Sequence, residues 1–206
     1  MRRVGIIDYG QGNIFSIGKA IQKLQTEFVI SENVEELSSC SHIVLPGVGA
    51  FPSAMRKLKE RNLDKFIVDI SDEKPIMGIC LGAQLLFSSS TELGLNQGLG
   101  VINGDVVSFN SNNVSKLMNV GWRRTYVNSK RSDLALYKEQ IDKQEFYYVH
   151  KFHIENCDKS TVQYLSRNQD YEFVSAVEYK NVIACQFHPE KSREQGLNLI
   201  HKFITK

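Results

Sequence analysis

The segment PIMGICLGAQLLF, residues 75–87, joins a short apolar run to a cysteine and then to a stretch with helical character. It predicts a strand that ends at Cys80 and a helix over residues 82–88. Gly78 and Gly82 flank the cysteine, because larger side chains there would hold the helix away from the strand. A strand that turns directly into a helix is the repeating unit of a parallel sheet covered by helices.

The rest of the first half repeats this unit. Three more runs are short and apolar, as strands buried on both faces are: residues 4–8, 27–30 and 42–46. Apolar side chains recur at helical spacing in residues 14–24, and residues 53–62 form another helical segment. We therefore predict an α/β fold with a central, mostly parallel sheet flanked by helices.

The second half is richer in β-branched and aromatic residues. One strand is expected within the Gly- and Asn-rich stretch that follows Gly94, at residues 101–109. Four further runs predict antiparallel strands added to the parallel sheet: residues 145–154, 161–167, 171–179 and 181–187. No helix is expected after the first half until residues 193–206. No linker divides the chain, so we expect a single domain over residues 1–206.

Composition narrows the class of protein. The 206 residues are 42% hydrophobic and 23% charged, with a formal net charge of +2, and the basic residues are not interleaved with aromatic ones as nucleic-acid surfaces are. The apolar run near the N-terminus is too short for a signal sequence or a membrane span. The four cysteines form no CxxC pair, which argues against disulfides and thiolate zinc sites. We therefore expect a cytoplasmic protein that binds neither nucleic acid nor membrane.

Cys80 has two interpretations. At a strand-to-helix turn its side chain would stand clear of the sheet, and the start of the helix would stabilise a thiolate. The N–H of Leu81 could then bind an oxyanion, together with an N–H from the PGVG loop at Val48 or Gly49. The alternative is that Cys80 is a small buried apolar residue at a strand end. The local pattern alone leaves both open.

The downstream stretch CQFHPEKS favours the nucleophile. The proline after His188 holds that residue in an extended conformation, in which residues i and i+2 project to the same side. Glu190 is the i+2 residue, so its carboxylate can orient one ring nitrogen while the other faces outward. We expect Cys80, His188 and Glu190 to act as nucleophile, base and orienting acid in acyl transfer through a thioester.

A metal site has to be weighed at residues 150–157. On a regular strand His153, Glu155 and Cys157 would share a face, whereas His150 would point away. This spacing fits no common zinc pattern, so we expect an exposed strand and turn and no metal.

Six motifs resemble, in chain order, those of the class I glutamine amidotransferases: DYGQGN (8–13), LPGVGAF (45–51), GICLGAQLLF (78–87), NVGW (119–122), FYYVH (146–150) and QFHPEKS (186–192). Within that superfamily the opening motif and the PGVG loop look most like those of the glutaminase subunits of imidazole glycerol phosphate synthase. The resemblance implies hydrolysis of L-glutamine through a cysteinyl thioester, without a cofactor. It also implies a heterodimer with a (β/α)8-barrel synthase, which uses the ammonia to make imidazole glycerol phosphate and an aminoimidazole carboxamide ribotide in histidine biosynthesis.

The resemblance also assigns roles to individual residues. It matches Cys80, His188 and Glu190 to the catalytic triad. It implies an oxyanion region at Val48, Gly49 and Leu81, substrate contacts at Gln84, Gly82, His150 and Lys151, and a partner interface at Asn13, Trp122, Arg123 and Lys191. Two positions depart from the family pattern: Lys151 stands where a small hydroxyl residue is usual, and Arg123 where asparagine is usual.

Three alternatives stay open. Relatives of this subunit supply ammonia to synthases that convert an acetamido group of a surface-polysaccharide sugar into an acetamidino group, with the same thiol chemistry. Cysteine-elbow proteins that act on glyoxals or serve as chaperones also place a thiol at a strand-to-helix turn, but they need neither the HPE motif nor Gln84. An inactive subunit would have lost a triad residue, and none is lost.

Overall fold

The computed structural model describes residues 2–109, 118–128, 130, 132–158 and 160–206. The strands of the first half are β1 (Arg3–Ile7), β2 (Glu27–Ser31), β3 (His42–Leu45), β4 (Ile76–Ile79), β5 (Phe87–Ser90) and β6 (Asn96–Gln97). Those that follow are β7 (Ile102–Ser108), β8 (Asn119–Val127), β9 (Glu145–His150), β10 (Phe152–Glu155), β11 (Val162–Asn168), β12 (Tyr171–Tyr179) and β13 (Val182–Cys185). The helices are α1 (Ile14–Lys23), α2 (Val34–Ser38), α3 (Phe51–Glu60), α4 (Leu63–Ile70), α5 (Leu81–Leu85), α6 (Lys138–Ile141) and α7 (Arg193–Thr205), with a 3-10 turn η2 (Pro189–Lys191).

The central part of the sheet is parallel, as predicted. Its strands run in the order β2-β1-β3-β4-β13, and each neighbouring pair is parallel. The position of β13 corrects the expectation that residues 181–187 add to the sheet as another antiparallel strand. Residues 182–185 instead pair in parallel with β4 and antiparallel with β12. The strand β13 is therefore the seam where the parallel core meets the antiparallel extension.

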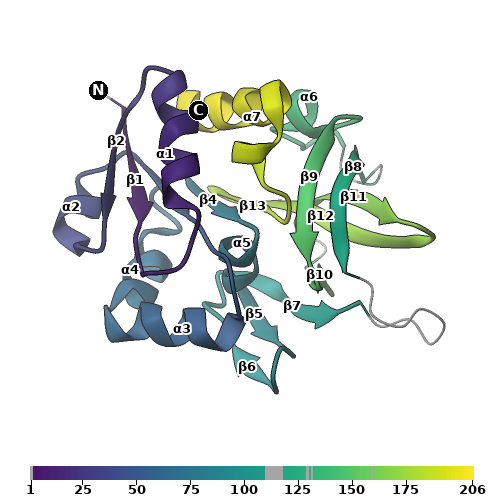
Figure 1. Cartoon of the computed structure of the whole chain (residues 1–206), viewed down its shortest axis with the longest axis horizontal. Helices are drawn as coiled ribbons and strands as arrows, with labels where there is room; N and C mark the ends of the chain where they lie inside the picture. Colours follow the sequence, from purple (N-terminus) through teal and green to yellow (C-terminus); the bar gives the residue numbers. More distant parts are fainter. Residues whose placement is uncertain (1, 110–117, 129, 131, 159) are drawn as a thin grey trace.

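The antiparallel half forms a wing beside this core (Figure 1). One branch continues from β12 to β10 and β7, and another pairs β12 with β11, β11 with β8, and β8 with β9. The single strand expected over residues 145–154 is divided at Lys151, so that β9 joins β8 whereas β10 joins β7 and β12. The division lets one short segment connect both branches of the wing.

Several elements were not predicted. The strands β5, β6 and β8 and the helices α2, α4 and α6 were absent from the expectation, although α4 buries one apolar stripe: Leu63, Phe66, Ile67 and Ile70. The helix expected over residues 82–88 ends at Leu85, because the chain turns there into β5, which pairs with β6 and β7. The short α5 thus serves as a turn that presents Cys80.

Two apolar clusters cover the two faces of the central sheet. One is formed with α3 and α4, and the other with α1 and α7 (Figure 1). The carboxyl ends of β3, β4 and β13 meet at one edge, because these strands are parallel. Among the described residues, no helix is both long and apolar enough to cross a membrane.

Candidate active site

Cys80 occupies the turn between β4 and α5 in a conformation that few residues adopt. Its φ is 53° and its ψ is −110°, outside the regions favoured by residues with a side chain. Its N–H donates to the carbonyl of Cys185 at 2.7 Å, and its carbonyl accepts from the N–H of Gln84 at 3.1 Å. These bonds to β13 and α5 hold the strained backbone, so that the sulfur stands at the edge of the sheet.

Close approach of the chain explains Gly82, two residues after Cys80. A Cβ at Gly82 would lie 2.0 Å from the carbonyl oxygen of Leu45, at the end of β3. Gly82 does not line the cavity described below, so its predicted contact with a substrate gains no support, and its position is explained by the packing of α5 on the loop after β3.

His188 and Glu190 form the pair expected from the HPE motif. The distance from Nδ1 of His188 to Oε1 of Glu190 is 2.9 Å, and both side chains are almost fully buried. The intervening turn is fixed by Ser192, whose hydroxyl donates to the carbonyl of His188 at 2.6 Å and accepts from the N–H of Tyr147 at 3.0 Å. The carboxylate therefore holds the imidazole in one orientation.

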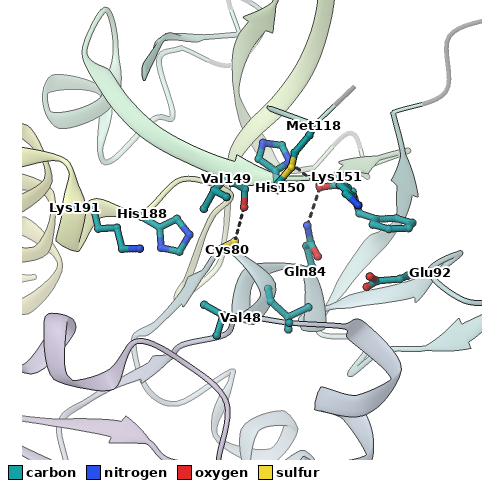
Figure 2. Close-up of a pocket in the computed structure, with 13 residues that line it drawn as sticks. Val48, Cys80, Gln84, Glu92, Met118, Val149, His150, Lys151, His188 and Lys191 are labelled. Carbon is teal, nitrogen blue, oxygen red and sulfur yellow. Dashed lines mark hydrogen bonds between the residues drawn. The ribbon is translucent and has the colours of Figure 1, made fainter. Parts of the chain in front are cut away.

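The other ring nitrogen of His188 is Nε2. Among the described residues, the buried Nε2 has no hydrogen-bond partner. The side chain of Cys80 is nevertheless close enough to influence the pKa of the imidazole, and Figure 2 shows the two side chains beside each other. Burial lowers the pKa of His188, but the nearby sulfur of Cys80 and the carboxylate of Glu190 outweigh burial and raise this pKa to about 10. Cys80 and Glu190 thus favour the protonated form of the imidazole.

Replacing Glu190 tests this electrostatic assignment. We expect Glu190→Gln to lower the pKa of His188, because the amide removes a negative charge that favours the imidazolium. The measurement is an NMR titration of His188 in both proteins. Equal titration midpoints would show that the carboxylate does not stabilise the protonated ring.

A cavity of about 270 Å³ opens at Cys80 and contains most of the predicted site residues (Figure 2). Predicted residues that line it are Val48, Gly49, Cys80, Leu81, Gln84, His150, Lys151, His188 and Lys191. The loop after β3 thus lines the same cavity as Cys80. Gly49 has a φ of +104°, so that loop uses a conformation that favours glycine.

Hydrogen bonds of Gln84 and Gln186 connect the wall of this cavity to Cys80. The amide nitrogen of Gln84 donates to the carbonyl of Phe152 and to Oε1 of Gln186, both at 2.9 Å. The amide nitrogen of Gln186 in turn lies 3.9 Å from the sulfur of Cys80. Sequence analysis did not single out Gln186, and only its place two residues before His188 could have pointed to it.

Glu92 is a second lining residue that sequence analysis missed. Its Oε2 accepts from the N–H of Phe51 at the start of α3, at 2.8 Å, and its carboxylate borders the cavity (Figure 2). Lys151, whose side chain is exposed, borders the same cavity. The cavity therefore offers charged groups of both signs away from the nucleophile.

His150 contributes a fixed, neutral ring. Burial lowers its pKa to about 3, and the carbonyl of Phe152 only partly opposes this. Its Nδ1 lies 2.7 Å from that carbonyl, so this nitrogen carries the proton, and Nε2 accepts from the amide of Asn119 at 2.8 Å. His150 thus shapes the wall of the cavity without adding charge.

The residues weighed as metal ligands do not form a cluster, and the expectation of an exposed strand there is wrong, because His150 and His153 are buried. Nε2 of His153 lies 3.5 Å from Glu155, whereas Cys157 follows Asn156, whose φ of +52° ends the strand. The rings of His150 and His153 both contact Phe109, so they do not point to opposite faces as a regular strand would require. In the described ranges, no group of three or more potential ligands could hold a metal ion.

The predicted interface residues lie beyond the cavity, except for Lys191 on its wall. Trp122 is partly exposed, and its ring centroid lies 4.6 Å from the guanidinium of Arg193. Arg123 donates to Asn168 at 2.9 Å and to two carbonyls of its own strand. Asn13 begins α1 without capping it through its side chain. Phe15, two residues after Asn13, and Val120, on the same strand as Trp122, are exposed apolar residues.

Comparison with known proteins points to one family. The family described as "Glutamine amidotransferase class-I" matches residues 5–206. The "Imidazole glycerol phosphate synthase subunit HisH" of Rhodopirellula baltica is 38% identical over 98% of this chain and 97% of its own length. The protein of the same name from Methanocaldococcus jannaschii is 40% identical over 98% of each chain.

Solved structures agree on the architecture. A putative GMP synthase component from Thermoplasma acidophilum superposes with a TM-score of 0.72 at 21% identity, covering 100% of this chain and 93% of that one. The structure of PurLQS from Thermotoga maritima gives a TM-score of 0.72 at 19% identity, covering 99% and 98%. At this identity the likeness concerns the fold alone.

Proposed function

The chain belongs to the class I glutamine amidotransferase family, and from this premise we propose that it is a glutaminase whose nucleophile is Cys80. The observation that carries the proposal is the joint placement of Cys80 and His188 on one cavity, with Glu190 behind the imidazole at 2.9 Å. The family does not favour the alternative of a glyoxalase- or chaperone-like protein. We propose that the whole chain acts as one catalytic domain in the cytoplasm.

The proposed reaction has two halves. The thiolate of Cys80 attacks the side-chain carbonyl carbon of glutamine, and the resulting oxyanion is bound by backbone N–H groups of Leu81 and of the Val48–Gly49 loop. His188 then donates a proton to the leaving nitrogen, so that the C–N bond breaks and ammonia departs from a thioester. Water, deprotonated by His188, attacks the thioester, and glutamate is released as the C–S bond breaks.

The part of the cavity wall formed by Gln84, Glu92 and Lys151 suits the α-amino and α-carboxylate groups of glutamine. The carboxylate of Glu92 can pair with the substrate's ammonium group, and the oxygen of Gln84 can accept from it, because both N–H groups of that amide are already used. The side chain of Lys151 can pair with the α-carboxylate. Glutamine itself is therefore the proposed substrate, rather than a simple amide that lacks these charges.

We propose that the ammonia passes to a (β/α)8-barrel synthase that makes imidazole glycerol phosphate for histidine biosynthesis. Two proteins named as the HisH subunit of imidazole glycerol phosphate synthase support this assignment, because they are 38% and 40% identical to this chain over nearly its full length. The test is glutamine turnover with each candidate synthase. Stimulation by a sugar-amidinating synthase, and none by the barrel enzyme, would contradict the histidine-pathway assignment while leaving the glutaminase chemistry intact.

The isolated chain is expected to hydrolyse glutamine slowly. Gly49 gives the oxyanion loop a backbone that can rotate at low cost, so partner binding can decide whether an N–H faces the oxyanion. We expect the synthase and its ribonucleotide ligand to raise glutaminase activity by about 10- to 100-fold, measured as glutamate released. Full activity of the chain alone would contradict control by the partner.

A further inference from the structure

The side chain of Gln186 lies between the substrate cavity and the nucleophile. It is fully buried, and its backbone N–H donates to the carbonyl of Ser175 at 2.9 Å. The chain is extended at His188, so the side chains of Gln186 and His188 project to the same side, where Cys80 lies. Phe187 points the other way and stacks on Phe146 with ring centroids 3.9 Å apart.

The hydrogen bonds fix which end of each amide faces which neighbour. The carbonyl of Phe152 can only accept, so the atom of Gln84 that meets it must be the nitrogen. That same nitrogen donates to Gln186, so the atom of Gln186 that receives the bond must be the oxygen. The nitrogen of Gln186 is then the end that faces Cys80, 3.9 Å from its sulfur.

In this series of hydrogen bonds the amide N–H of Gln186 is directed at the sulfur of Cys80. We propose that Gln186 is a positioning residue that donates an N–H to the sulfur of Cys80 and holds Gln84 with its oxygen toward the substrate. This role deepens the proposed glutaminase function and rests on it. An N–H directed at sulfur favours the thiolate over the thiol, because hydrogen bonds to a charged acceptor are stronger than those to a neutral one. One buried amide thus links the nucleophile to the residue proposed to bind the substrate's ammonium group.

The sharpest variant changes one atom of the amide. Gln186→Glu keeps an oxygen that can accept from Gln84, but it has no N–H for Cys80 and places a negative charge beside the thiolate. We expect kcat for glutamine in the complex with the synthase to fall about 10- to 100-fold, with a KM changed far less. We also expect the pH profile of Cys80 alkylation by iodoacetamide, measured on the chain alone, to move to higher pH.

A second variant and a control separate this role from folding. Gln186→Met fills similar space without charge, and because it loses both hydrogen bonds it is expected to raise KM as well as to lower kcat. Gln22→Glu makes the same chemical change at an exposed position of α1 and should leave kcat, KM and the alkylation profile unchanged. Thermal unfolding of each variant shows whether it folds.

The outcomes distinguish this proposal from the proposed function. If the unaltered complex releases no glutamate from glutamine, the glutaminase function fails, and the alkylation profile still tests the contact between Gln186 and Cys80. If the unaltered complex is active, and folded Gln186→Glu and Gln186→Met keep kcat within twofold and the alkylation profile unmoved, Gln186 has no positioning role.

Discussion

Cys80→Ser is expected to reduce glutaminase activity by about 10⁴-fold or more, since the hydroxyl is a far poorer nucleophile in a site built around a thiolate. The change only replaces sulfur by the smaller oxygen, and the backbone bonds of residue 80 to Cys185 and Gln84 do not involve the side chain. The variant should therefore fold and still bind its synthase. Glutamate release with saturating partner, together with thermal unfolding, measures both expectations.

Cys157→Ser is the matched control for that experiment. Burial raises the pKa of the Cys157 thiol to about 12, and it also raises the pKa values of Cys40 and Cys185, so these three thiols are poor nucleophiles at neutral pH. Activity should persist when any of them is replaced by serine or alanine. Retained activity in Cys80→Ser, or its loss in Cys157→Ser, would show that the nucleophile had been assigned to the wrong thiol.

The placement of Cys80 at a strand-to-helix turn and of Glu190 beside His188 could be predicted, because short motifs determine this local geometry. In GICLG the glycines set the turn and the cysteine occupies it, and in HPE the proline fixes the relation between His188 and Glu190 at two residues. The parallel sheet followed from the apolar runs for a similar reason, because each run and its helix are adjacent in sequence. Local rules were sufficient for these features.

The remaining site residues depend on contacts between distant segments. Gln186 accepts a hydrogen bond from Gln84, 102 positions away in sequence. The carboxylate of Glu92 accepts a hydrogen bond from the N–H of Phe51, the first residue of α3. No rule of sequence spacing predicts either contact. The helix α4 differs, since Leu63, Phe66, Ile67 and Ile70 follow helical spacing, so the sequence alone indicates this helix.

Strand β8 was missed for a physical reason. Its residues NVGWRRTYV alternate imperfectly, and most are exposed or half-buried, so the apolar period that signals a strand is weak. Its pairing with β9 and β11 forms the strand, through backbone bonds that do not depend on side-chain polarity. The same strand contains Trp122 and Arg123, the two residues that the resemblance places at a partner interface.

Gly82→Ala is expected to destabilise the protein although alanine is the better helix former. Helix propensity alone favours alanine by about 1 kcal/mol. The added Cβ would lie 2.0 Å from the carbonyl oxygen of Leu45, which is backbone and cannot rotate away. Overpacking of this kind costs about 1–3 kcal/mol or more, so α5 must move away from β3. Glutaminase activity should fall with stability, because α5 carries Leu81 and Gln84.

The control is a glycine with free space around it. A Cβ at Gly94 meets no atom within 4 Å, although its φ of +109° strains any other residue. Gly94→Ala therefore measures backbone strain without a clash, and activity should be retained. Urea unfolding of both variants gives the two free energies. If Gly82→Ala were as stable as the unaltered chain, the contact between α5 and the end of β3 would be too loose to fix the oxyanion loop against Cys80. The tight packing at Gly82 is therefore the structural condition on which the geometry of the proposed site depends.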